Sequence, residues 1–311
     1  MRYCALQNVS LNLPRLAYMA KNDDTKLFNL ITERFILAVR AHKEKRVFME
    51  KLLSLGEDGP LALLTMNRDG MPYLRFNLAS HLIGMVGLNE MVQIHTGEEM
   101  HESKRALKFG IKAIAHMNLL TDKLRRQENM KIVLEQTPAE STSYRFARLD
   151  LGRFSPLSGR IMKGDISTGE IYYTNSTHLN VGHSMNPIER VTTEGLFHPL
   201  IEAGSISHIW LGEARPSKEA ISDFVIKTFK HTTNDQIAFS PEFTTCNKCH
   251  RTGRGISDNC SYCGSADVDG ITRITGYFTK VSSWNKGKLG ELKDRYRNNE
   301  FFSEKRKVAN E

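Results

Sequence analysis

The 311-residue sequence lacks several features that would place it in a class at once. It has no run of about eighteen apolar residues, which excludes a membrane-spanning helix, and nothing near its start resembles a secretory signal. It contains no internal repeat and no low-complexity segment. The phosphate-loop pattern Gly-x-x-x-x-Gly-Lys-Ser/Thr is also absent. We expect a globular chain in the cytoplasm.

Cysteine is scarce, and four of the five cysteines form one cluster. They make two Cys-x-x-Cys pairs separated by ten residues, a linker in which Gly253 and Gly255 allow the chain to fold back. Four thiolates are the ligand set of a structural zinc ion. An iron-sulfur cluster is the alternative, whereas a disulfide is disfavoured because cytosolic thiols stay reduced. The predicted zinc ligands are Cys246, Cys249, Cys260 and Cys263.

Gly276 follows this cluster by thirteen residues, in the segment Arg-Ile-Thr-Gly-Tyr of residues 273–277. A glycine can carry a carbon radical because its α-carbon has no side chain and can flatten between two amide groups that share the unpaired electron. The alternative is a turn glycine that supplies a positive φ. Cys4 is the one cysteine outside the cluster, and it is either reactive or a small buried core residue.

The chain is basic, with a net charge of +8, which permits a nucleic-acid-binding module built on a zinc ribbon. The distribution of charge argues against that interpretation. In residues 284–311 the basic side chains alternate with Glu291, Asp294, Glu300 and Glu304, a pattern typical of a solvated mixed-charge face. The excess positive charge would then serve solubility or phosphorylated small molecules.

Helical and strand patterns alternate along the first three quarters of the chain, which predicts a parallel α/β layer structure. We expect residues 1–239 to form this body and residues 240–311 to form a small cysteine-held appendage. The predicted strands are 9–13, closed by Pro14, then 131–136, 171–174 and 207–211. The predicted helices are 26–55, capped by Asp24 or Thr25, then 98–126, and one opened by Pro216 and Ser217.

Several short segments, taken in order, carry a family resemblance over nearly the whole chain. They include Asn-Val-Ser-Leu-Asn-Leu-Pro-Arg at 8–15, Thr-Pro-Ala-Glu-Ser at 137–141, Tyr-Tyr-Thr-Asn-Ser at 172–176, and Trp-Asn-Lys-Gly-Lys at 284–288. Together with the cysteine pairs and residues 273–277, they resemble the C-terminal half of an anaerobic, or class III, ribonucleoside-triphosphate reductase. This is a glycyl-radical enzyme that makes deoxynucleotides without oxygen.

The resemblance implies part of a ten-stranded α/β barrel, with the glycine loop beside the active site and a zinc appendage holding it. A radical S-adenosylmethionine activating protein would remove a hydrogen atom from Gly276, the stored radical. Gly276 would then draw hydrogen from a cysteine, and the thiyl radical would take the 3′-hydrogen of the ribose. Cys4 is the candidate thiyl residue, although Ala5 follows it where the family has arginine. Glu140, Ser141 and Asn175 are the candidate substrate-binding residues.

The resemblance also implies partners. These are ribonucleoside triphosphates, the activating protein, formate or a thiol protein as reductant, and either a second copy of the chain or an N-terminal half that completes the barrel. We therefore expect a truncated or split gene product. Two alternatives stay open from the residues alone: another glycyl-radical enzyme, such as an acyl-transferring lyase, which the cysteine cluster disfavours, and a zinc-ribbon nucleic-acid-binding protein.

Overall fold

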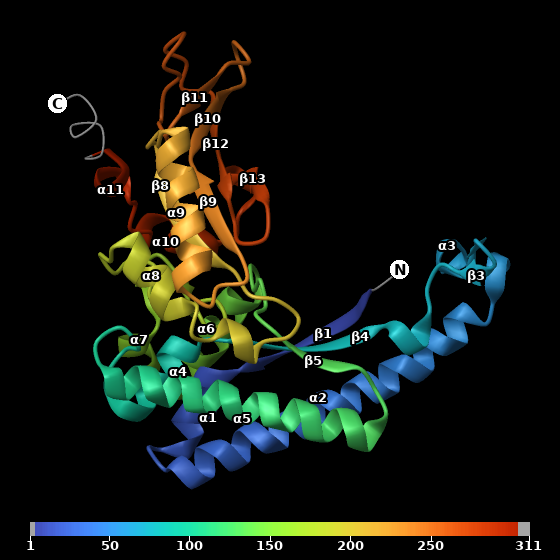
Figure 1. Ribbon diagram of the computed structural model, residues 1–311. Helices are drawn as coiled ribbons and strands as arrows, with labels where there is room; N and C mark the ends of the chain where they lie inside the picture. Colours follow the sequence, from blue (N-terminus) through green and yellow to red (C-terminus); the bar gives the residue numbers. More distant parts are fainter. Residues whose placement is uncertain (1–3, 304–311) are drawn as a thin grey trace.

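A three-stranded parallel sheet forms the base of the computed structural model, which describes residues 4–303 (Figure 1). The strand order is β1-β4-β5, with β4 between its two neighbours. The register aligns Ser10 of β1 with Gly84 of β4 and Glu135 of β5, so these three residues lie at one level across the sheet. The strands are β1 (Ala5–Asn12), β4 (Ser80–Val86) and β5 (Ile132–Glu135).

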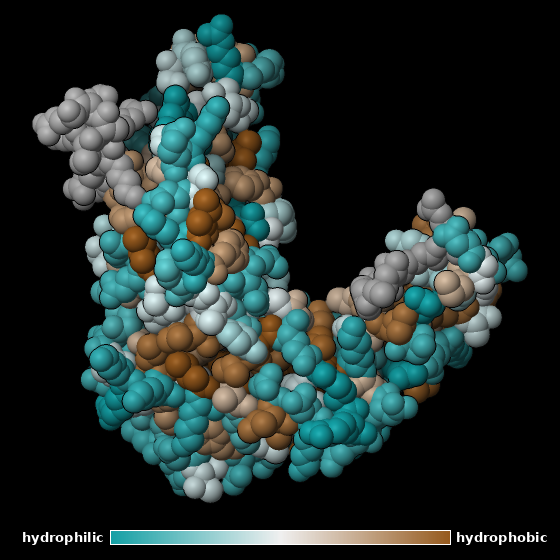
Figure 2. Space-filling view, in the orientation of Figure 1, coloured by the Kyte–Doolittle hydropathy of each residue, from teal (hydrophilic) through white to brown (hydrophobic). Residues whose placement is uncertain are grey.

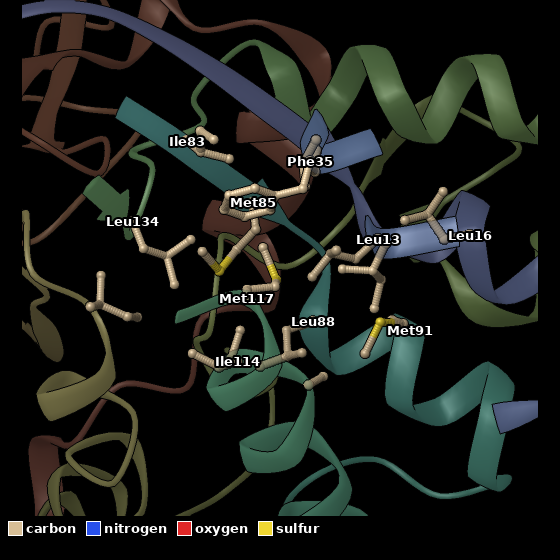
Figure 3. Close-up of a cluster of buried hydrophobic side chains, with 14 of the residues drawn as sticks. Leu13, Leu16, Phe35, Ile83, Met85, Leu88, Met91, Ile114, Met117 and Leu134 are labelled. Atoms are coloured by element: carbon tan, nitrogen blue, oxygen red, sulfur yellow. The ribbon is translucent and has the colours of Figure 1, made fainter. Parts of the chain in front are cut away.

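Helices pack against this sheet and enclose the main hydrophobic core. Phe35, Ile83 and Met117 are completely buried there, and they come from a helix, a strand and a second helix (Figure 3). The side chains of Asp23 and Ser103 accept hydrogen bonds from backbone N–H groups in the first turns of the two long helices. The helices are α1 (Leu13–Ala20), α2 (Asp24–Leu53), α4 (Leu88–Thr96) and α5 (Lys104–Glu128).

A middle layer follows, in which an antiparallel strand pair lies beside short helices. Tyr172 and Tyr173, at the end of this pair, are almost fully buried, and Tyr173 donates a hydrogen bond to Asp150 of α6. Arg15 of α1 pairs with the same carboxylate, which joins the middle layer to the base. The elements are α6 (Thr142–Phe154), α7 (Leu157–Ile161), β6 (Lys163–Asp165), β7 (Glu170–Tyr172) and α8 (Pro187–Glu194).

The last third of the chain forms an upright part that rises from the base (Figure 1). It begins with a parallel strand pair and its connecting helix, β8 (Ser207–Gly212), α9 (Lys218–His231) and β9 (Ile237–Pro241). An antiparallel sheet of order β11-β10-β12-β13 follows; α10 then packs against β6, β7 and α6, and α11 packs against the β8–α9–β9 unit. Their bounds are β10 (Phe243–Cys246), β11 (Thr252–Arg254), β12 (Val268–Arg273), β13 (Phe278–Lys280), α10 (Lys286–Asp294) and α11 (Asn299–Ser303).

An arm extends from the base, formed by the end of α2 and a small unit of α3 (Ala62–Thr65), β2 (Asn67–Arg68) and β3 (Met71–Pro72) (Figure 1). Apolar side chains such as Val47, Phe48 and Leu63 are more than half exposed on it. Figure 2 shows brown, apolar atoms along the arm and in the angle between the base and the upright part. The arm therefore has little packing of its own within the described residues.

The predicted α/β class is confirmed, and the predicted elements agree to within a few residues, apart from the start of the helix expected at residue 98. That helix begins at Lys104, because Ser103 caps it. The first strand extends from Ala5 to Asn12, and Pro14 opens α1 instead of closing the strand, since proline is favoured in the first turn of a helix. The expected boundary after residue 239 falls inside β9.

The strands of residues 4–303 form separate sheets of two to four strands, so a ten-stranded barrel is not present in this part of the chain. Residues 304–311 of the expected appendage lie outside the described residues. Among the helices described, none combines the length and the apolar character that a membrane span requires.

The close approach of strands in the base sheet can be tested at Gly84. An alanine Cβ there would lie 2.9 Å from Thr137 Cβ and 3.0 Å from Asn8 Oδ1, so we expect Gly84→Ala to lower the free energy of unfolding by about 1–3 kcal/mol. Gly152→Ala in α6 is the control, because no atom lies within 4 Å of its added Cβ, and it should gain about 0.5–1 kcal/mol. Urea denaturation of both variants measures this; equal effects would contradict it.

Candidate functional site

Gly276 lies at the tip of the hairpin between β12 and β13. The turn is closed by the Ile274 N–H group, which donates to the Tyr277 carbonyl at 2.9 Å. Gly276 is not among the glycines with a positive φ, and an added Cβ would meet only Glu140 Oε1 at 3.6 Å and Pro138 Cβ at 3.9 Å. The turn therefore does not require glycine for backbone conformation or for space, which disfavours the simple turn interpretation.

Charged side chains contact both backbone groups of Gly276. Its N–H donates to Glu140 Oε1 at 3.2 Å, and its carbonyl accepts from Arg273 Nη2 at 2.9 Å. Arg273 Nε also donates to the Thr275 carbonyl at 2.9 Å. Glu140 is held in turn by Asn285, whose Nδ2 donates to the Glu140 carbonyl at 2.9 Å. The glycine is therefore bracketed by a carboxylate and a guanidinium.

A buried charge cluster of Lys288, Glu291 and Arg295 holds the strand end that leads to Gly276. Lys288 Nζ donates to Thr275 Oγ1 at 2.9 Å and to Glu291 Oε2 at 2.5 Å. Arg295 donates to Glu291 Oε1 at 2.8 Å and to the carbonyls of residues 273 and 274 at 2.9 and 2.8 Å. All three side chains are at most 2% exposed. The cluster thus fixes the loop through backbone and hydroxyl groups.

The expectation that residues 284–311 form a solvated face is therefore wrong for these three residues. Burial alone would raise the pKa of Glu291, but the positive charges of Lys288 and Arg295 outweigh that effect and lower it. Burial lowers the pKa of Lys288, against the opposing effect of Glu291. The guanidinium of Arg295 also lies 3.8 Å from the ring centroid of Trp210, which adds a cation–π contact.

A pocket of about 240 Å³ opens beside Gly276. Glu135, at the end of β5, lines it together with His178 from the loop after β7. Burial raises the pKa of Glu135 to about 7, and Asn8 Nδ2 donates a hydrogen bond to its carboxyl group. The pocket therefore contains a carboxyl group that can hold a proton near neutral pH. The sequence interpretation missed Glu135, although an acidic residue ending the apolar run 132–134 was a usable signal.

The candidate substrate-binding residues have different positions. Glu140 contacts Gly276 itself. Asn175 is buried, and its Nδ2 donates to Thr275 Oγ1 and to Glu291 Oε2, both at 3.3 Å, so it supports the glycine loop and does not line the pocket. Ser141 is exposed at the start of α6, and its side chain makes no capping hydrogen bond.

Cys4 lies at the opposite end of the base sheet from the pocket. It precedes Ser10, which is level with Glu135, by six residues, or about 20 Å along a β-strand. Burial raises the pKa of its thiol, which keeps the group protonated. Cys4 therefore lies well away from the pocket in this structure, a position that disfavours the thiyl role expected of it.

The four clustered cysteines have the geometry of a tetrahedral metal site. Their sulfur atoms all lie within 4.8 Å of one another, with Cys246–Cys263 at 3.7 Å and Cys249–Cys260 at 3.6 Å. Zinc–sulfur bonds of about 2.3 Å give tetrahedral edges of about 3.8 Å, which these distances match. The backbone N–H of Tyr262 lowers the pKa of Cys260 to about 6, whereas at Cys263 the lowering effect of the Ser265 backbone hydrogen bond is outweighed by burial and the neighbouring thiols, which raise the pKa to about 11. The donor set therefore fits a zinc ion.

The metal site and Gly276 lie at opposite ends of one sheet. Cys246 at the end of β10 pairs with Val268 at the start of β12, and Arg273 is five residues further along, about 17 Å away. The cysteine cluster therefore does not contact the glycine loop, and any support that it gives the loop passes through the sheet. The cluster lies at one end of this sheet, and Gly276 lies at the other end.

The fold is that of solved anaerobic ribonucleotide reductases. One structure titled "Anaerobic ribonucleotide reductase" matches with a TM-score of 0.78 and 21% identity, over 96% of this chain and 45% of that one. The Thermotoga maritima anaerobic ribonucleotide reductase in complex with dATP and CTP matches with a TM-score of 0.74 and 19% identity, over 93% of this chain and 45% of that one.

The sequence comparisons give the family. Residues 1–297 match the family of the anaerobic ribonucleoside-triphosphate reductases, and the chain belongs to this family. It is 27% identical over 303 residues to the Escherichia coli enzyme and 25% identical over 308 residues to that of phage T4. In both cases 92% of this chain is covered, but it spans only 41% and 47% of those relatives.

The zinc assignment predicts that the chain binds about one zinc ion through the four thiolates. Cys260→Ser should lose the ion on dialysis against a chelator, because one thiolate ligand is removed. Cys4→Ser is the matched control and should retain it, since Cys4 lies outside the cluster. Zinc and iron content by atomic absorption measures this, and iron with sulfide in place of zinc would contradict it.

The buried cluster predicts a large effect of Lys288→Met. Removing one partner leaves Glu291 a buried charge with fewer hydrogen bonds, so the free energy of unfolding should fall by about 3 kcal/mol. Lys293→Met on the same helix is the control, because Lys293 is 66% exposed and its ion pair with Glu170 should contribute at most about 1 kcal/mol. Urea denaturation compares them, and trypsin should cut after Arg273 faster in the first variant only.

Proposed function

We propose that this chain is the radical-storing half of an enzyme that reduces ribonucleoside triphosphates to deoxyribonucleoside triphosphates without oxygen. The observation that supports this proposal most strongly is the position of Gly276 beside a pocket lined by Glu135, whose carboxyl group can be protonated near neutral pH. Neither backbone conformation nor space requires a glycine at this position. Family membership supplies the chemical context. Family membership also favours this proposal over the two alternatives, a nucleic-acid-binding zinc ribbon and an acyl-transferring lyase.

The proposed reaction begins at the α-carbon of Gly276. An activating protein that cleaves S-adenosylmethionine takes one hydrogen atom from this carbon and leaves a glycyl radical. The radical draws a hydrogen atom from a cysteine thiol, and the resulting thiyl takes the 3′-hydrogen of the ribose. The protonated 2′-hydroxyl group then leaves as water, formate or a dithiol protein supplies two electrons, and the hydrogen atom returns to C3′.

The reacting cysteine comes, in this proposal, from outside these 311 residues. Four of the five cysteines form the metal site, and Cys4 lies at the far end of the base sheet. The relatives are about twice as long, which leaves room for that cysteine, for the remaining strands of a ten-stranded barrel and for a nucleotide-sensing domain. A companion N-terminal half, or a second copy of the chain, is the expected partner. Gly276 is exposed here and needs such a cover.

Glu135 is the residue that we assign to protonate the leaving hydroxyl group. Glu135 lines the pocket, and its raised pKa of about 7 keeps a large protonated fraction near neutral pH. Asn8 Nδ2 contacts this carboxyl group and orients it. In this proposal the 2′-hydroxyl of the ribose lies toward β5, and the 3′-hydrogen faces the side of the pocket where the cysteine enters.

In a turnover assay with the zinc-loaded chain, its N-terminal companion, an activating protein and formate or a dithiol protein, we expect deoxynucleotide to form. Glu135→Gln should lower kcat by at least about 100-fold, because general acid catalysis is lost. Glu189→Gln, an exposed carboxylate on α8, should leave kcat unchanged. The absence of product, or equal rates in the two variants, would contradict the assigned roles.

The pKa of Glu135 also predicts a pH dependence of stability. The folded-state pKa of about 7 exceeds the usual value of 4.5, so the folded chain binds this proton more tightly than the unfolded chain. This contribution to stability is complete at acid pH and is lost as pH rises from 4.5 to about 7. The denaturation midpoint of the wild type should therefore fall over this range relative to that of Glu135→Gln; parallel curves would contradict the shift.

A further inference from the structure

The two groups bonded to the α-carbon of Gly276 each form a hydrogen bond with a charged side chain, and the two side chains have opposite charges. Glu140, a carboxylate, accepts from the N–H at 3.2 Å, and Arg273, a guanidinium, donates to the carbonyl at 2.9 Å. Hydrogen bonds to charged groups are stronger than neutral ones. The nitrogen thus gains electron density while the carbonyl oxygen is polarised to accept it.

This arrangement matches what a carbon radical between an amide nitrogen and a carbonyl requires. Such a radical is stabilised when the nitrogen donates electron density and the carbonyl withdraws it. We propose that Glu140 and Arg273 stabilise the radical of Gly276 by polarising its two flanking groups in opposite directions. This inference rests on the proposed function. It assigns Glu140 an electronic role at the glycine in place of substrate binding.

Holding the loop is a separate task, and other residues already perform it. Lys288 and Arg295 bind Thr275 and the carbonyls of residues 273 and 274, and Asn175 binds Thr275. None of these contacts reaches the N–H or the carbonyl of Gly276. The charges of Glu140 and Arg273 therefore act where the unpaired electron would lie.

Arg273 also donates from Nε to the Thr275 carbonyl at 2.9 Å, which draws electron density from the amide that contains the Gly276 nitrogen. Glu140 opposes this effect, because its oxygen accepts from the N–H of the same amide. The charge of Glu140 is consequently the one that matters most for electron donation by the Gly276 nitrogen. Glu140→Gln keeps an oxygen that can accept the N–H and removes only the charge.

The test is electron paramagnetic resonance of the zinc-loaded chain, activated without oxygen by a radical S-adenosylmethionine activating protein. The radical should give a doublet from its single α-hydrogen. In Glu140→Gln the unpaired electron should be more localised on the α-carbon, so the doublet splitting should increase and the radical should decay about tenfold faster, the factor that corresponds to about 1.4 kcal/mol. Arg273→Lys should shift the splitting and the decay rate in the same direction but less, because the lost bond to the Gly276 carbonyl is partly offset by the lost bond to the Thr275 carbonyl.

Glu189→Gln is the control, since it makes the same chemical change on α8 and should reproduce the wild-type doublet. Urea denaturation of each variant separates a folding defect from an electronic one. Unchanged splitting and lifetime in folded Glu140→Gln would overturn the inference and leave the proposed function standing. A wild-type chain that gives no doublet under conditions that activate a full-length relative would overturn both.

Discussion

The buried charge cluster of Lys288, Glu291 and Arg295 determines where Gly276 lies. Two cations and one carboxylate without solvent need hydrogen-bond partners. Apart from Glu291, the acceptors for Lys288 and Arg295 are the Thr275 hydroxyl and the carbonyls of residues 273 and 274, while Arg295 Nε has no partner. The loop therefore cannot move away without leaving buried charge unsatisfied. A glycine that exchanges hydrogen atoms with another group depends on such fixed placement.

The upright sheet separates the placement of Gly276 from metal binding. The thiolates close one end of β10 and β12, and the hairpin tip with Gly276 is at the other end. Four strands, β10 to β13, connect the two ends, and an ion held by the thiolates would add stability to this part of the chain. The metal site thus supports the glycine indirectly, through the sheet, while α10 contacts the loop.

The sequence was enough to predict the cysteine cluster and most of the helices, because these depend on spacing and on local periodicity. It was not enough to predict that Lys288 and Arg295 are buried, since charges three and four residues apart look the same on an exposed helix. The pocket role of Glu135 and the distance of Cys4 depend on strand register, which brings together residues more than a hundred positions apart.

The central claim is that Gly276 stores the radical, and the most direct measurement is where the backbone breaks when the activated chain meets air. Mass spectrometry should find a fragment that ends at residue 275, and its yield should follow the amount of radical formed beforehand. Gly276→Ala, for which the loop has space, should give a folded chain with no such fragment. An intact backbone after activation, or scission at another residue, would contradict the account.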